Sequence, residues 1–118
     1  MRDFRKLMVW EKGHELVLAV YRATVTYPKD ELFGLTSQTR RAVCSITHNI
    51  AEGCGRSSDV ELARFMDIAS GSASELENQL LIGRDLQFLK NNDYEKLQSQ
   101  LVEIRRMLNS FIQKLRSK

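Results

Sequence analysis

Residues 35–56 read LTSQTRRAVCSITHNIAEGCGR, and no other stretch of the chain is patterned so strongly. Apolar side chains recur in it at three- and four-residue steps, which is the spacing of one helix face: Leu35, Ala42, Val43, Ile46 and Ile50. Polar side chains recur at the same steps along another face: Gln38, Arg41, Ser45, Asn49 and Glu52. The apolar face predicts a core helix. The ordered polar stripe lies either in water or inside an interface, and the sequence leaves both alternatives open.

Helical patterning extends over the rest of the 118 residues, for which we predict a single domain, residues 1–118. The predicted helices span about 7–27, 36–53, 59–90 and 93–116. Pro28 ends the first, because proline lacks a backbone donor. Thr36 or Ser37 is the expected N-cap of the second, and Ser58 with Glu61 forms a capping box for the third. Four helices with short connections predict an all-α, antiparallel up-down four-helix bundle.

Two apolar seams are expected to hold the first and fourth helices in the core. The first seam consists of Trp10, Gly13, Val17, Val20, Thr24 and Tyr27, and the other of Leu97, Leu101, Ile104, Leu108, Phe111 and Leu115. The third helix contains a run of small residues, 69–74. Because glycine costs about 0.5–1 kcal/mol relative to alanine in a helix interior, we expect a neighbouring helix, in this chain or another copy, to lie against Gly71.

Composition narrows the function class. No apolar run approaches the roughly 20 residues of a membrane-spanning helix, so no membrane partner is expected. Charged residues, and not the apolar core of a signal peptide, follow the first four residues. With only two cysteines, Cys44 and Cys54, the chain lacks a disulfide framework, and we expect a reducing, cytoplasmic setting.

Positive charge is concentrated at the two ends of the chain. Residues 1–29 hold six basic and three acidic residues, and residues 90–118 hold seven and three, whereas residues 30–89 hold five and nine. In an up-down bundle the first and last helices are neighbours, so their charges add into one field. The candidate phosphate-binding residues are Arg22, Lys29, Arg105, Arg106, Lys114 and Arg116. The alternative is a solvated face with no ligand.

A second candidate set is structural. Glu52 lies near the C-terminal end of its helix, where a negative charge is disfavoured, and a partner such as Arg40, Arg41 or Arg56 would relieve it. We favour an ion-pair network over paired catalytic carboxylates. Its candidate members are Gln38, Arg40, Arg41, Asn49, Glu52 and Glu75.

Cys44, His48 and Glu52 follow one another at four-residue steps and share one helix face. The functional alternative is a metal site or an imidazole-activated thiol. We favour a thiol beside a surface histidine, because a zinc site needs further ligands and no second Cys/His pair follows. The expectation is therefore a non-enzymatic protein without catalytic residues, metal or cofactor.

The patterned stretch resembles the family of proteins encoded in intervening sequences of 23S rRNA genes, also called four-helix bundle proteins. The resemblance extends over nearly the whole chain. It rests on Leu35–Gln38, Arg40–Ala42, Ser45–Ile46, Asn49–Gly53, on Phe4, Leu7, Val9 and Trp10 at the start, on Pro28 and Glu31–Leu35, and on Ala69, Gly71–Ser72 and Glu75–Glu77. The chain departs from the family pattern at Thr39, where an apolar residue is expected, and at Gly83, where alanine is expected.

This resemblance implies a ring-like homo-oligomer, with the homopentamer as the favoured form. The fold is also similar to the accessory variability protein of diversity-generating retroelements, a basic ring that binds nucleic acid and a reverse transcriptase. We therefore expect a nucleic-acid-associated binding module, for RNA or DNA, that acts through its basic surface. The alternative is a scaffold or adaptor for a protein partner, with no nucleic-acid role.

Overall fold

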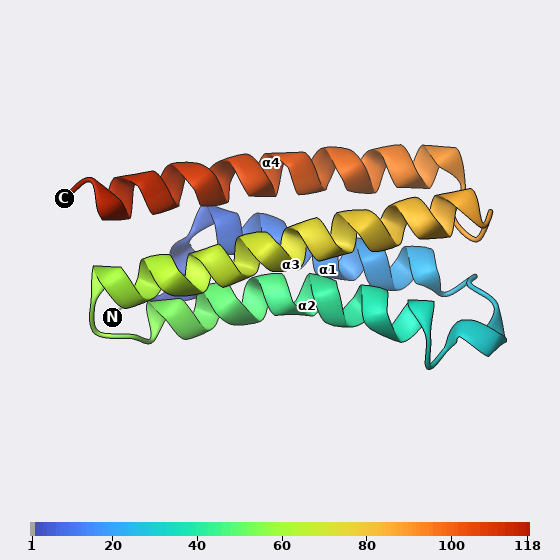
Figure 1. Ribbon diagram of the computed structural model, residues 1–118, viewed down its shortest axis with the longest axis horizontal. Helices are drawn as coiled ribbons and strands as arrows, with labels where there is room; N and C mark the ends of the chain where they lie inside the picture. Colours follow the sequence, from blue (N-terminus) through green and yellow to red (C-terminus); the bar gives the residue numbers. More distant parts are fainter. Residues whose placement is uncertain (1) are drawn as a thin grey trace.

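All regular structure in the computed structural model, which describes residues 2–118, is helical. Four long helices, with short 3₁₀ turns before α1 and before α2, are arranged in the order η1 (Phe4–Lys6), α1 (Met8–Thr24), η2 (Lys29–Glu31), α2 (Leu35–Cys54), α3 (Asp59–Asp85) and α4 (Asn91–Arg116). The helices lie side by side along the 46 Å long axis and are joined by short connections at their ends (Figure 1). The prediction of an all-α, four-helix fold is confirmed.

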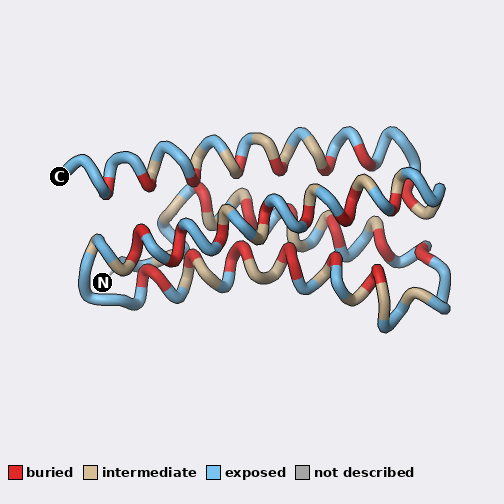
Figure 2. The backbone as a smooth tube through the Cα atoms, in the orientation of Figure 1, coloured by how far each residue is buried: buried red, intermediate tan, exposed pale blue. Residues whose placement is uncertain are grey.

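In each helix the buried residues recur along the side that faces the other helices (Figure 2). All five apolar residues predicted for α2 are buried there, and Ile46 and Ile50 are 0% exposed. The predicted seam of α1 needs correction, because Val9 and Leu16 are buried while Trp10 and Val17 are only half-buried. The pairs Val9/Leu16 and Trp10/Val17 lie on two adjacent faces of α1, and both are apolar. The periodicity of the sequence alone therefore did not decide which face packs into the core.

Three helix ends differ from their predicted positions. Helix α1 ends at Thr24, three residues before the expected end, and α4 begins at Asn91, two residues early. Helix α3 ends at Asp85, five residues early, because Gln87 adopts a left-handed φ of 65°. The Phe88 amide then donates to the Gly83 carbonyl (2.9 Å), and the Gln87 amide to that of Arg84 (2.9 Å), which is a Schellman ending.

The start of α2 also differs from the prediction, since neither Thr36 nor Ser37 caps it. The helix begins at Leu35, whose amide donates to Oε1 of Glu31 at 3.0 Å. Glu31 thus places a carboxylate at the positive end of the helix dipole. The predicted cap of α3 is present, because Ser58 Oγ accepts from the Glu61 amide at 3.2 Å, although the Glu61 side chain pairs with Arg64 instead of returning to Ser58.

Replacing Glu31 by alanine should lower the free energy of unfolding by about 1 kcal/mol, the typical contribution of a helix N-cap. The variant loses both the acceptor for the Leu35 amide and the favourable charge. Chemical denaturation would measure the change, with Asp30→Ala as the control, because no hydrogen bond or ion pair joins Asp30 to other described residues. An equal loss in both variants would contradict the capping role.

Both departures from the family pattern have a structural reason. Thr39 is completely buried, and its hydroxyl donates to the Leu35 carbonyl at 2.7 Å, so a polar residue in the core is satisfied locally. At Gly83 a Cβ atom would collide with the hydroxyl of Tyr27, which is itself buried against α3. Alanine at Gly83 would therefore require the Tyr27 ring to move.

Gly71 has no neighbouring helix within this chain. A Cβ atom built on it would meet nothing within 4 Å among the described residues, so the part of the expectation that placed a helix of the same chain there is wrong. Its other part, a helix from another copy, remains a prediction.

Across residues 2–118, none of the helices combines the length and apolar character that crossing a bilayer requires.

Candidate nucleic-acid interface

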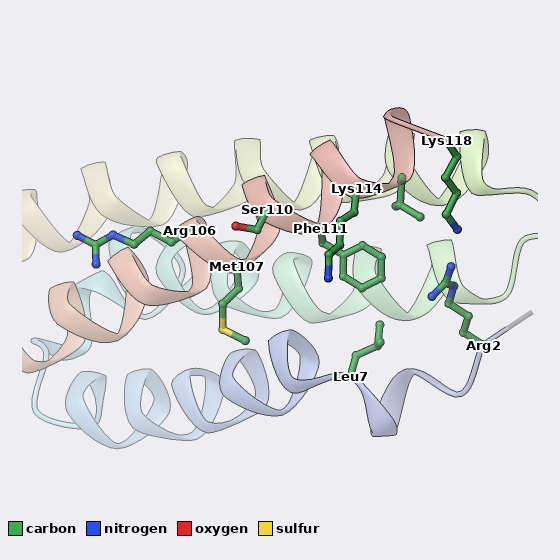
Figure 3. A pocket seen from close by; sticks show the side chains of 9 residues that line it. Arg2, Leu7, Arg106, Met107, Ser110, Phe111, Lys114 and Lys118 are labelled. Atoms are coloured by element: carbon green, nitrogen blue, oxygen red, sulfur yellow. The ribbon is translucent and has the colours of Figure 1, made fainter.

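The C-terminal half of α4 faces the beginning of the chain across a cavity of about 550 Å³ (Figure 3). Its floor is apolar, formed by Leu7, Met107, Phe111 and Leu115, and its rim carries Arg2, Arg106, Lys114 and Lys118. The α4 residues recur at three- and four-residue steps, so the helix presents them on one side. We call this feature the basic cavity.

Arg2 reaches the basic cavity because the segment before α1 is fixed at several points. The Arg2 amide donates to the Cys54 carbonyl at the end of α2 (3.0 Å), and Asp3 accepts from the Arg5 amide at the start of η1 (3.1 Å). The Arg2 guanidinium then lies 5.5 Å from the centroid of the Phe111 ring, within the range of a cation–π contact.

One carboxylate, that of Asp59, lies beside the basic cavity and pairs with two of its cations. Lys118 Nζ is 2.8 Å from Asp59 Oδ2, and an Arg2 guanidinium nitrogen is 3.4 Å from Oδ1. The hydrogen bond from Lys118, with a smaller contribution from Arg2, holds the pKa of Asp59 below its usual value. Asp59 therefore stays ionised at neutral pH and orders the Arg2 and Lys118 side chains.

The other two cations, Arg106 and Lys114, have no acidic partner in the part of the chain that the structure describes. Both side chains are exposed. Four cations against one carboxylate leave a local excess of positive charge over an apolar floor. Such a surface suits a ligand that carries several anionic groups and flat apolar surface.

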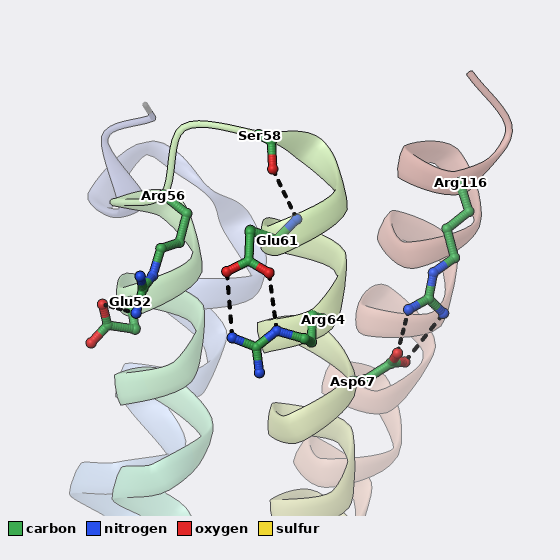
Figure 4. Close-up of polar contacts among 7 residues, drawn as sticks. All are labelled: Glu52, Arg56, Ser58, Glu61, Arg64, Asp67 and Arg116. Carbon is green, nitrogen blue, oxygen red and sulfur yellow. Dashed lines mark hydrogen bonds and ion pairs between the residues drawn. The ribbon is translucent and has the colours of Figure 1, made fainter.

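Two other predicted phosphate-binding residues are engaged elsewhere. Arg105 is less than one-third exposed and pairs with Glu77 of α3 at 3.0 Å, so it joins α3 to α4. Arg116 forms a two-point contact with Asp67 of α3 (Figure 4). Both charges are neutralised within the chain, and neither residue lines the basic cavity.

The remaining two predicted phosphate-binding residues lie at the opposite end of the bundle. Arg22 is in the last turn of α1 and Lys29 is in η2 (Figure 1). Arg22 lines a separate cavity with Lys90 and Asp93. The structure therefore divides the predicted basic set, and only Arg106 and Lys114 meet at one site.

The predicted polar network is divided as well. Arg40 turns to α1, where its Nε donates to the Thr24 hydroxyl at 2.9 Å, and Asn49 donates to the Ser45 carbonyl within α2 at 2.8 Å. Glu52 pairs with Arg56 at 3.4 Å, one of the three partners considered (Figure 4). Gln38, Arg41 and Glu75 line a groove between α2 and α3, together with Ser45 and Gln79.

The residues Cys44, His48 and Glu52 share a helix face, and two of them contact residues outside this set. Cys44 Sγ lies 3.7 Å from the Tyr21 hydroxyl, and Glu52 is occupied by Arg56. Within residues 2–118, no three His, Cys, Asp or Glu side chains are placed to hold a metal ion together.

Sequence reasoning missed Arg2, Lys118 and the exposed side of Phe111 as parts of the site. Lys118 follows Lys114 by four residues and Arg106 by twelve, so the spacing of α4, continued two residues past the helix end at Arg116, could have placed it on the same side. Arg2 could not have been found in this way, because its position depends on hydrogen bonding to the end of α2.

Comparisons with known proteins agree with the fold. The family model described as "23S rRNA-intervening sequence protein" matches residues 5–110. A solved structure of a protein of unknown function from the S23 ribosomal protein family of Bacteroides thetaiotaomicron is similar, with a TM-score of 0.80 and 25% identity over 89% of this chain and 98% of that one. None of the curated proteins matches. Because the family model covers most of the sequence, the chain belongs to the 23S rRNA-intervening sequence protein family.

Proposed function

We propose that this protein is a non-enzymatic, homo-oligomeric helical module that binds RNA through the basic cavity. The observation that carries the proposal is the pair of unpartnered cations, Arg106 and Lys114, above the apolar floor. The family's description refers to 23S rRNA, which makes RNA the first polymer to test. In this mechanism the two cations bind phosphates, and Phe111 offers a surface on which a base can stack.

The oligomeric part of the proposal rests on exposed apolar side chains. Leu18, Tyr21 and Val25 follow one another at three- and four-residue steps along α1 and its C-terminal cap, and they are 42%, 41% and 72% exposed, so three large apolar residues lie on one face of the helix. In an antiparallel up-down bundle, α1 packs on α2 and α4, as the contacts of this chain support. A ring-like assembly, for which five copies is the form to test, would repeat the basic cavity in every subunit.

Reversing both unpartnered charges should remove most of the RNA affinity. We expect the Arg106→Glu/Lys114→Glu variant to bind a labelled, mixed-sequence single-stranded RNA at least tenfold more weakly at low salt. Because each phosphate contact on a single strand contributes about 0.7 to the slope of log affinity against log salt, losing two should flatten that slope by about 1.4. Fluorescence anisotropy across a salt series measures both quantities.

The matched control is Lys29→Glu/Lys90→Glu, which makes the same change in net charge at the opposite end of the bundle. This control should keep the affinity within about threefold, the size of a general charge effect. Equal losses in the two variants would overturn the assignment to the basic cavity. An oligomer that ignores RNA at all salt concentrations would instead favour the scaffold alternative.

A further inference from the structure

A groove of about 500 Å³ lies between α2 and α3 and shares no residue with the basic cavity. It is lined by Gln38, Arg41 and Ser45 of α2 and by Glu75 and Gln79 of α3. We call it the polar groove. Ligand sites in proteins typically have volumes of about 300–1,000 Å³. Because every side chain that lines this one is polar, it suits a small hydrophilic ligand.

The two walls of the polar groove carry opposite charges. On α2, Arg41 presents a guanidinium, which can only donate hydrogen bonds, and on α3, Glu75 presents a carboxylate, which can only accept them. Both side chains are exposed, and neither forms an ion pair or a side-chain hydrogen bond with any described residue. The polar groove therefore holds one free cation and one free anion, which do not neutralise each other.

A buried acceptor lies on the same wall as Glu75. Gln79 follows Glu75 by four residues, so the two side chains are neighbours on one face of α3. Gln79 is only 7% exposed, and its Oε1 has no hydrogen-bond partner among the described residues. A buried acceptor without a partner is unfavourable, and native proteins seldom retain one without a reason. The α3 wall thus offers two acceptors to a donor group in the groove.

The part of the polar groove at Ser45 is fixed by hydrogen bonds. The Ser45 hydroxyl oxygen lies 2.8 Å from that of Ser72, so the two hydroxyls join α2 to α3, and Asn49 Nδ2 donates to Ser45 Oγ at 3.1 Å. The two walls are therefore held together before any ligand arrives. A site that is already formed loses little conformational freedom when it binds a ligand.

We propose that the polar groove binds a small zwitterion with a primary ammonium and a carboxylate, which is the chemistry of a free amino acid. The ligand carboxylate pairs with Arg41, because the planar guanidinium matches a carboxylate in two-point fashion. The ligand ammonium has three N–H donors and reaches the Glu75 carboxylate and Gln79 Oε1. A simple anion is repelled by Glu75 and a simple cation by Arg41, so a ligand with both charges fits the walls best. This binding requires neither RNA nor a second copy of the chain.

Calorimetric titration of the wild-type protein with each of the common L-amino acids tests the proposal. We expect at least one of them to bind with a Kd below about 1 mM and to raise the Tm as its concentration increases. The N-trimethyl form of that amino acid keeps both charges but has no ammonium N–H. It should bind at least about tenfold more weakly, because it cannot donate to Glu75 or Gln79.

Two charge-neutralising variants test which wall recognises which group. The wild type should prefer the amino acid at least about tenfold over its C-terminal amide and over its N-acetyl derivative. Arg41→Gln should abolish only the preference over the amide, and Glu75→Gln only the preference over the N-acetyl derivative. The matched controls are Arg22→Gln and Glu15→Gln, which make the same changes at exposed positions of α1 and should keep both preferences.

The outcomes are distinct from those of the RNA experiment. Absence of binding by all the amino acids would overturn the proposal, and so would binding that both polar-groove variants leave unchanged. Equal affinity for the N-trimethyl form would overturn the assignment of a primary ammonium to the α3 wall. The Arg106→Glu/Lys114→Glu variant should bind the amino acid as the wild type does, since neither residue lines the polar groove.

Discussion

Replacing Gly83 with alanine is expected to lower the free energy of unfolding by about 1–3 kcal/mol, the usual cost of overpacking a core. The added methyl group would collide with the hydroxyl of Tyr27 and lie 3.2 Å from the ring carbon that bears it. The ring cannot easily retreat, because Tyr27 is only 6% exposed and packs against Phe88 with 5.7 Å between ring centroids. Thermal or chemical unfolding would measure the loss.

A double-mutant cycle tests whether the hydroxyl is the cause. The Tyr27 hydroxyl has no hydrogen-bond partner in the described structure, so Tyr27→Phe should be neutral or stabilising on its own. Combined with Gly83→Ala it should recover most of the loss, giving a coupling energy of about 1 kcal/mol or more. Gly55→Ala is the control, because it adds a methyl group at an exposed position and should change stability by less than about 0.5 kcal/mol. Strict additivity in the cycle would contradict the steric explanation.

The fold could be predicted from the sequence where one physical signal dominated. In α2 the apolar residues occupy one line of the helix and the polar residues another, so Ile46 and Ile50 were placed correctly. In α1, Val9 and Leu16 compete with Trp10 and Val17 on a neighbouring line, and only the position of the other helices decides between them.

Helix ends were harder to predict, because the residues that mark them in the sequence were weak signals or because the ends depend on the folded structure. Pro28 correctly indicated a break after α1, although the helix ends three residues before the predicted end. The end of α3 depends on Gln87 in a left-handed conformation, where glycine is the usual residue, so nothing in the sequence marked it. At α2, Glu31 replaces a serine or threonine cap from four residues before the helix start.

The candidate site could be predicted only in part, because the folded structure decides which charged side chains are paired. A count of basic residues cannot distinguish a free cation from a paired one. Arg105 and Arg106 are adjacent in sequence, yet Arg105 is held by Glu77 and Arg106 lines the basic cavity. The electrostatic field at the surface depends on the charges that remain unpaired after folding. The carboxylates that neutralise the paired cations of α4 lie on α3, far away in the sequence.

Replacing Glu77 with glutamine is the second substitution that we expect to lower the free energy of unfolding strongly, because Glu77 connects α3 to α4 through two side chains. Its Oε2 accepts from the Gln98 amide at 2.6 Å and its Oε1 from the Arg105 guanidinium at 3.0 Å. Arg105 Nε is buried without a partner, so this guanidinium is already incompletely satisfied. We expect Glu77→Gln to lower the free energy of unfolding by about 1.5–3 kcal/mol, the range for hydrogen bonds to charged groups.

The loss should depend on pH in a defined direction. The hydrogen bond from Gln98, followed by that from Arg105, holds the pKa of Glu77 below its usual value of 4.5. A carboxyl whose pKa is lowered on folding stabilises the protein above its unfolded pKa, and this contribution disappears as the pH falls through the folded pKa. The difference between wild type and Glu77→Gln should therefore be full at pH 7 and shrink below about pH 4.5.

Denaturation series at several pH values, with Glu95→Gln as the control, would test this expectation. Glu95 is exposed on α4 and has no ion pair with any described residue, so its replacement should change stability by less than about 0.5 kcal/mol at any pH. A Glu77→Gln difference that stayed constant from neutral to acidic pH would mean that packing, not the carboxylate charge, joins α3 to α4. The charge-dependent result would also explain why Arg105 serves the fold, which leaves Arg106 and Lys114 as the cations available to a ligand.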